Sequence, residues 1–181
     1  MGTPKFLQSA HDYIFSNTKM SWLWLIVRVY VGWQWLHAGY EKIINPAWVG
    51  ETAGGAMTGF VNGALAKTAG AMAAAQNVPI ETVHANVSDW YAWFLSHAVL
   101  PNVYVWSHMI AYGEVLVGLG LIVGLFTCWA AFFGSLMNMN FLMAGTVSTN
   151  PVLLLLALLI MMAHKIAGFI GLDYYWLRKN R

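Results

Sequence analysis

Glu114 is a carboxylate in the middle of an otherwise apolar run, SHMIAYGEVLVGLGLIVGLF, at residues 107–126. An ionisable group at the centre of a membrane span costs about 3 kcal/mol on insertion scales, so it usually faces a partner or a cavity. Arg28 and Asn138 stand in two other apolar runs. We expect Arg28 to pair with Glu114 and Asn138 to complete the network, since a buried ion pair needs satisfied hydrogen bonds. Such a network either lines a polar site in the membrane or fixes the register of the helices.

Side chains of these runs have the types that a quinone site needs. A quinone requires hydrogen-bond donors for its carbonyl oxygens, apolar walls for its ring and a proton source for its reduction. The candidate donors are Arg28, Asn138, His164 and Lys165. The candidate walls are Trp35 and Phe141, although plain packing produces the same pattern. Glu114 could relay protons.

Three further titratable side chains, His37, Glu41 and His108, are expected in the outer half of the same runs. His37 and Glu41 are one helical turn apart and could share a proton. With His108 they are the candidates for a metal site, and proton transfer at the outer surface is an alternative. His37 and His108 could also ligate a haem, but no haem motif surrounds them. We expect neither a metal nor a haem.

The composition indicates an integral membrane protein. Of 181 residues, 59% are hydrophobic and 9% are charged, whereas soluble domains carry about 25% charged residues. Spanning a bilayer takes about 20 apolar residues. Four segments qualify: 22–43, 103–126, 128–147 and 151–171. The last three are joined by short connections, which make neighbours antiparallel. We therefore expect an all-α, antiparallel four-helix bundle in the membrane, forming a single domain over residues 1–181.

One face of the first segment has a distinct pattern. Arg28, Gly32, Trp35, Gly39 and Lys42 recur every three or four residues, so they share one helix face. The two glycines let another backbone come close or leave room for a flat ligand.

Residues 45–102 form a long excursion between the first two spans. Its Ala, Gly and Met content predicts a partly helical external segment, either a cap packed on the bundle or a docking surface for a partner. Basic residues favour the cytoplasmic side. They flank the first and fourth spans at Lys5, Lys19, Arg178, Lys179 and Arg181. Both termini are therefore predicted to be cytoplasmic.

The chain resembles the DoxX/DoxD family of membrane proteins. The residues that carry the resemblance are Arg28, Gly32, Gly39, Lys42, Trp48, the run 113–127, Asn138, Phe141 and Asn150-Pro151. The resemblance implies a four-helix protein of a prokaryotic plasma membrane, tied to redox chemistry. The best-defined activity of the family is thiosulfate:quinone oxidoreductase, in which a DoxD-like subunit works with a second subunit, DoxA. No DoxA-like domain is fused here, so that chemistry would need a separate partner.

Three functions follow as alternatives. The first is a redox subunit of DoxX/DoxD type that reacts with quinone and, with a partner, oxidises thiosulfate or a related sulfur compound. The second is a non-catalytic membrane anchor or assembly subunit, with a partner subunit on residues 45–102. The third is a small transporter, disfavoured because no inverted repeat or discontinuous helix is visible. A net charge of +2 gives no indication of a nucleic-acid partner.

Overall fold

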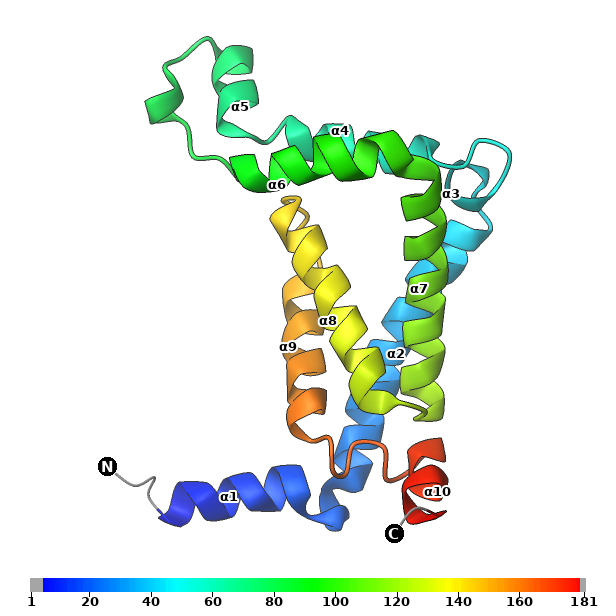
Figure 1. Ribbon diagram of the computed structural model, residues 1–181. Helices are drawn as coiled ribbons and strands as arrows, with labels where there is room; N and C mark the ends of the chain where they lie inside the picture. Colours follow the sequence, from blue (N-terminus) through cyan, green and yellow to red (C-terminus); the bar gives the residue numbers. More distant parts are fainter. Residues whose placement is uncertain (1–4, 180–181) are drawn as a thin grey trace. The chain divides into compact units, whose positions relative to one another are not determined.

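The computed structural model describes residues 5–179, and within that range the chain is built from helices and turns without a β-strand (Figure 1). The longer helices are α1 (Lys5–Ser16), α2 (Ser21–Ile43), α4 (Gly55–Leu65), α7 (Val103–Val123), α8 (Thr127–Met143) and α9 (Asn150–Met162). The shorter ones are η1 (Thr18–Met20), α3 (Pro46–Val49), α5 (Ala69–Gln76), η2 (Ile80–Thr82), α6 (Asp89–Phe94), η3 (Leu95–Val99), η4 (Leu100–Asn102) and α10 (Leu172–Lys179). The all-α prediction is confirmed for this range.

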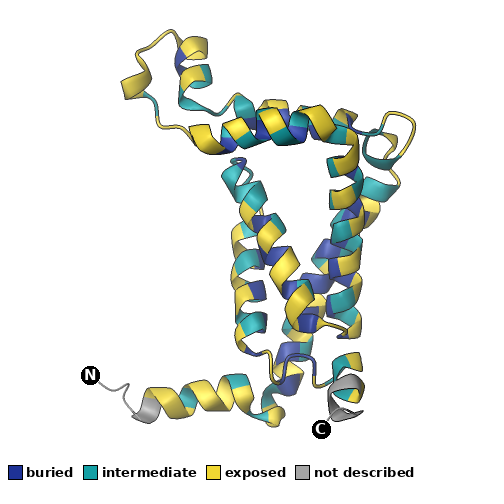
Figure 2. Cartoon of the chain, in the orientation of Figure 1, coloured by how far each residue is buried: buried dark blue, intermediate teal, exposed yellow. Residues whose placement is uncertain are grey.

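The predicted stripe on the first segment is the buried face of α2. Arg28, Gly32, Trp35 and Gly39 are buried, and Lys42 at the end of the stripe is half-buried. Large apolar side chains on the other faces of α2 are exposed, as they are on α7, α8 and α9 (Figure 2). Examples are Trp22, Ile26, Leu116, Trp129, Phe133 and Leu155. An apolar surface of this extent is typical of helices covered by another apolar phase, such as lipid.

One helical run of the described chain is long and apolar enough to cross a membrane, judged by length and composition. It is Asp89–Val123, which includes α6, η3, η4 and α7. Pro101 lies inside this run. The chain passes through the π-helical turn η3 and the 3-10 turn η4, and it changes direction sharply before α7 (Figure 1). A proline lacks the N–H that a regular helix would use, and π turns mark such irregular places.

The second and third predicted segments are helical over slightly shorter ranges than expected. α7 ends at Val123 and α8 at Met143. Gly124 directly follows α7 with a φ of 70°, and Gly145 lies shortly after α8 with the same φ. Glycine tolerates this left-handed conformation, which commonly ends helices.

The predicted segment 151–171 is helical only in its first part. α9 has 13 residues and ends at Met162, and residues 163–171 form turns. A helix of this length covers about 20 Å, which is less than the roughly 30 Å of a bilayer core. Hydropathy did not reveal the end because the turns are themselves apolar.

The chain divides into two compact units. Within the described range, unit 1 holds residues 5–37, 114–136 and 152–179, and unit 2 holds residues 38–113 and 137–151. Each unit gathers segments that are distant in sequence, and α2, α7, α8 and α9 contribute to both. The single domain expected over 1–181 stays a prediction.

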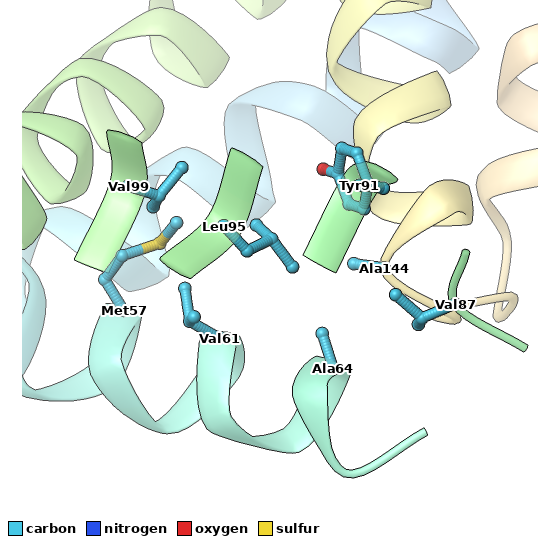
Figure 3. Packing of buried hydrophobic residues seen from close by; sticks show 8 residues of the cluster. All are labelled: Met57, Val61, Ala64, Val87, Tyr91, Leu95, Val99 and Ala144. Carbon is cyan, nitrogen blue, oxygen red and sulfur yellow. The ribbon is translucent and has the colours of Figure 1, made fainter. Parts of the chain in front are cut away.

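Unit 2 contains the excursion and has a hydrophobic core of its own (Figure 3). The core residues are Met57, Val61, Ala64, Val87, Tyr91, Leu95, Val99 and Ala144. Hydrogen bonds from two side chains join the excursion to the end of α8 and the turn after it. The Tyr91 hydroxyl donates to Asn140 O at 2.9 Å, and Lys67 Nζ donates to Gly145 O at 2.9 Å. The excursion is therefore partly helical, as predicted, and it packs on the C-terminal end of α8.

Candidate functional site

Arg28 is a fully buried cation that donates to backbone carbonyls of the segment after α9. Its side chain is 1% exposed. Nη1 donates to Ala167 O at 3.1 Å, and Nη2 donates to Ile170 O at 2.7 Å. A guanidinium carries several donors in a planar fork, so it can bind two carbonyls that no helix satisfies. The turns at 163–171 and the buried arginine thus stabilise each other.

Asp173 is the second charged group at this place. Its two carboxylate oxygens accept from Phe126 N at 2.7 Å and Thr127 N at 2.9 Å, and its own N–H donates to Gly124 O at 2.8 Å. The carboxylate also attracts Arg28 electrostatically. The first N–H groups of a helix lack intrahelical partners, and an acidic side chain is a suitable cap. Asp173 therefore caps α8 from the start of α10.

Three glycines make this arrangement possible. Gly124 and Gly171 lie against the guanidinium: a Cβ on Gly124 would collide with Arg28 Nη1, and one on Gly171 would lie 2.8 Å from it. A Cβ on Gly168 would collide with the Asp173 carboxylate. We call Arg28, Asp173 and the backbone at Gly124, Ala167, Ile170 and Gly171 the Arg28 cluster. Its hydrogen bonds join α2, the α7–α8 turn and the segment before α10.

Asp173 was not among the site residues expected from the sequence. The sequence signal for such a cap lies at the start of α8. Phe126, the residue before Thr127, has no side-chain group that could cap the helix. An uncapped helix start implies a cap from elsewhere in the chain.

Glu114 lies on a different part of α7 from the Arg28 cluster. α2 and α7 are antiparallel and touch at glycines: a Cβ on Gly118 would lie 2.8 Å from Gly32 O and 2.5 Å from Leu36 N. From this contact, Arg28 lies toward the start of α2 and Glu114 lies toward the start of α7. Because the two helices are antiparallel, these are opposite directions. The register separates them by roughly 12 to 15 Å along the helix axis. The expected pairing of Arg28 with Glu114 does not fit this register. The side chain of Arg28 extends toward Gly124, which is the direction away from Glu114.

Glu114 is nevertheless buried, with 1% of its surface exposed. A carboxylate in such a place is expensive unless it has a structural partner or a function. The structure thus places two buried ionisable groups in unit 1, one at the Arg28 cluster and one on α7.

Asn138 is a fully buried amide on the unit 2 part of α8, at 0% exposure. Neither its Oδ1 nor its Nδ2 has a hydrogen-bond partner among the described residues. Leaving such a group unsatisfied costs about 1–3 kcal/mol. The convergence of Asn138 with Arg28 and Glu114 stays a prediction, since those two residues belong to unit 1.

The two predicted aromatic walls lie in different units. Trp35, in unit 1, is buried, and its indole Nε1 would lie 3.1 Å from a Cβ on Gly134 of α8. Phe141, in unit 2, is half-buried and packs edge-on against Phe60 with ring centroids 6.0 Å apart. Both make ordinary packing contacts, and their role as quinone walls stays a prediction.

His164 and Lys165 are exposed and lie in the turns that follow α9. They were candidate quinone donors on a helix expected to continue to residue 171, whereas α9 ends at Met162. The buried side chains of this segment are instead Ile166 and Ala167. The role of His164 and Lys165 as quinone donors stays a prediction.

The outer candidates show no metal centre. His37 and Glu41 are exposed, and His108 Nδ1 lies 2.8 Å from Tyr104 O on its own helix. Across residues 5–179, no three His, Cys, Asp or Glu side chains gather in a way that could hold a metal ion.

Asp173→Asn tests the capping role. We expect the substitution to lower the free energy of unfolding by about 1–2 kcal/mol, because an amide is a weaker acceptor for two N–H groups and removes the charge beside Arg28. The measurement is denaturant unfolding of the detergent-solubilised protein, followed by tryptophan fluorescence. Asp89→Asn, at an exposed carboxylate on α6, is the control and should unfold like the wild type. Equal stability of the two variants would contradict the capping role.

Apolar helices with an exposed apolar surface and buried ionisable groups define an α-helical membrane protein. The DoxX family model matches residues 23–150, which is most of the chain. The chain therefore belongs to the DoxX family of membrane proteins. No match is found among curated proteins or among solved structures. The matched range includes Arg28, Glu114 and Asn138, whereas Asp173 lies beyond it.

Proposed function

We propose that this chain is a membrane-embedded redox subunit that binds a quinone. The observation that carries the proposal is the fully buried Asn138 amide, which has no protein partner among the described residues. A quinone is soluble in the bilayer and presents carbonyl oxygens to which Nδ2 can donate. Binding would give the amide the hydrogen bond that it lacks.

Glu114 is proposed as the proton-exchanging group. Reduction of a quinone to a quinol takes up two electrons and two protons, and a carboxylate buried in a membrane helix is a common element of proton relays. The electrons come from a donor that a partner subunit oxidises. For a donor of the thiosulfate class, two thiosulfate ions give one tetrathionate and the two electrons required.

We propose an antiparallel bundle in a prokaryotic plasma membrane, in which α2, α7 and α8 are three crossings and α9 forms the fourth together with the apolar turns that follow it. The exposed apolar side chains on all four helices and the short turns between α7, α8 and α9 support it. Cytoplasmic termini are supported by the exposed Lys19 before α2. Arg181, which contributed to this orientation, lies outside the described residues.

A membrane anchor or assembly subunit is the second candidate. Trp90 and Trp93 on α6 favour it, because they are 63% and 64% exposed on a segment that has its own core. Exposed tryptophans are common at the centres of protein interfaces. This candidate predicts that no residue of the chain affects quinone binding.

Asn138→Leu distinguishes the two. Leucine keeps the volume and removes both polar atoms, so we expect decyl-ubiquinone to bind roughly tenfold more weakly through the loss of one hydrogen bond. The measurement is quenching of the intrinsic fluorescence of the ten tryptophans during titration of the purified protein.

Asn62→Leu provides the matched control at an exposed asparagine on α4 and should bind like the wild type. Glu114→Gln should keep quinone affinity while slowing quinone reduction once a donor system is supplied. Unchanged affinity of the Asn138→Leu variant would refute the quinone site and favour the anchor.

A further inference from the structure

We propose that α1 lies on the membrane surface, with its apolar half inserted between lipid headgroups at the leaflet where α2 begins. The occupant of this helix face is the bilayer itself. The proposal rests on the pattern of α1, on its exposure and on its attachment to α2, and it is independent of the quinone proposal.

The sequence of α1, KFLQSAHDYIFS, divides the helix into two halves. At 100° per residue, Leu7, Ala10 and Ile14 point to one side. Gln8 and Asp12 point to the opposite side. A short helix with one apolar and one strongly polar half is typical of segments that lie in the plane of a membrane interface.

The apolar half is largely exposed in the described structure. Leu7 is 55% exposed, Tyr13 is 52% exposed and Ile14 is 38% exposed. In a soluble helix of this pattern, such side chains would face the core. Tyr13 at the edge of the apolar half fits an interface, where tyrosine places its ring in lipid and its hydroxyl in water.

α1 is attached to the first turns of α2, within unit 1. Trp24 Nε1 donates to Ile14 O at 2.8 Å, and the rings of Phe15 and Trp24 lie 5.3 Å apart. Figure 1 shows α1 running crosswise to α2. Phe15, at one edge of the apolar half, packs on Trp24, so α1 is held against α2 along that edge.

The neighbouring surface of α2 identifies the occupant as lipid. Trp22 and Ile26 are each 67% exposed directly above the junction, so an apolar phase must begin at this level. Lys19 lies exposed in η1 between the two helices, where its ammonium group can reach lipid phosphates. The apolar half of α1 continues the surface that α2 already presents to hydrocarbon.

The test uses the full chain with Cys128, the single cysteine, replaced by Ser. One cysteine at a time is introduced by Leu7→Cys, Ile14→Cys, Gln8→Cys and Asp12→Cys, and each is spin-labelled. The proteins are reconstituted into vesicles of phosphatidylcholine and phosphatidylglycerol. Electron paramagnetic resonance then measures collisions with oxygen, which partitions into lipid, and with a nickel chelate, which stays in water.

We expect the ratio of oxygen to nickel collisions to be severalfold higher at positions 7 and 14 than at positions 8 and 12, at a depth of about 5–10 Å. The Gln8→Cys and Asp12→Cys labels are matched controls on the opposite half of the same helix. Similar ratios at all four positions would place α1 in water and overturn the proposal. Exclusion of both reagents at positions 7 and 14 would also overturn it, because it would show cover by a partner protein or a second copy.

Discussion

Arg28→Leu should lower the free energy of unfolding by about 3–5 kcal/mol, because two carbonyl groups lose a charged donor, at about 1.5–3 kcal/mol each. The substitution leaves Ala167 O and Ile170 O without their donor and Asp173 beside an empty space. It also keeps an apolar side chain on α2, so the loss cannot be attributed to a polar group placed in the membrane. The measurement is denaturant unfolding in detergent micelles, followed by tryptophan fluorescence.

Lys19→Leu is the control for Arg28→Leu, since it removes an exposed cation near the start of the same helix. We expect it to change the stability little. A double-mutant cycle with Asp173→Asn measures the electrostatic coupling between Arg28 and Asp173 separately from the carbonyl contacts. If Arg28→Leu were as stable as Lys19→Leu, the Arg28 cluster would not hold the three segments together.

Gly118→Ala is expected to destabilise the protein by about 1–3 kcal/mol, through overpacking where α2 and α7 touch. The added Cβ would lie 2.5 Å from Leu36 N and 2.8 Å from Gly32 O. These are backbone atoms, which cannot move aside as a flexible side chain can, so the two helices must separate. Thermal unfolding in detergent would show the effect as a lower midpoint.

Gly63→Ala is the matched substitution at a helical glycine without close neighbours. A Cβ at Gly63 of α4 would meet nothing within 4 Å. We expect this variant to be more stable than the wild type by about 1 kcal/mol, because alanine is the better helix former. Opposite changes in stability at the two glycines test the helix contact specifically. A stabilising effect of Gly118→Ala would show that α2 and α7 are not in close contact there.

Much of the fold follows from local patterns in the sequence. The spacing of Arg28, Gly32 and Trp35 identified the buried face of α2, since helical periodicity is a property of the backbone alone. The glycines in that stripe indicated a close approach of another helix, and Gly118 provides it. The burial of Glu114 and Asn138 followed in the same way from polar residues inside apolar runs.

The partner of Arg28 could not be predicted by the same reasoning. Depth along idealised spans suggested Glu114, but the register of two helices depends on which small residues meet. The groups that accept hydrogen bonds from Arg28 are backbone carbonyls. Every residue has one, so the sequence does not show which carbonyls are used. α9 ends where those carbonyls are bound, so a hydropathy pattern that continues to residue 171 could not show the end of the helix.

The cap on α8 has a consequence for how the protein is made. Asp173 follows Thr127 by 46 residues, and Ala167 follows Arg28 by 139 residues. During translation, α2, α7 and α8 are therefore synthesised while Arg28 lacks its acceptors and α8 lacks its cap. While α2, α7 and α8 are inserted, these groups must be unsatisfied or temporarily satisfied by water, lipid headgroups or the insertion machinery. Maturation is complete only when the segment from Ala167 to Asp173 leaves the ribosome and closes over them.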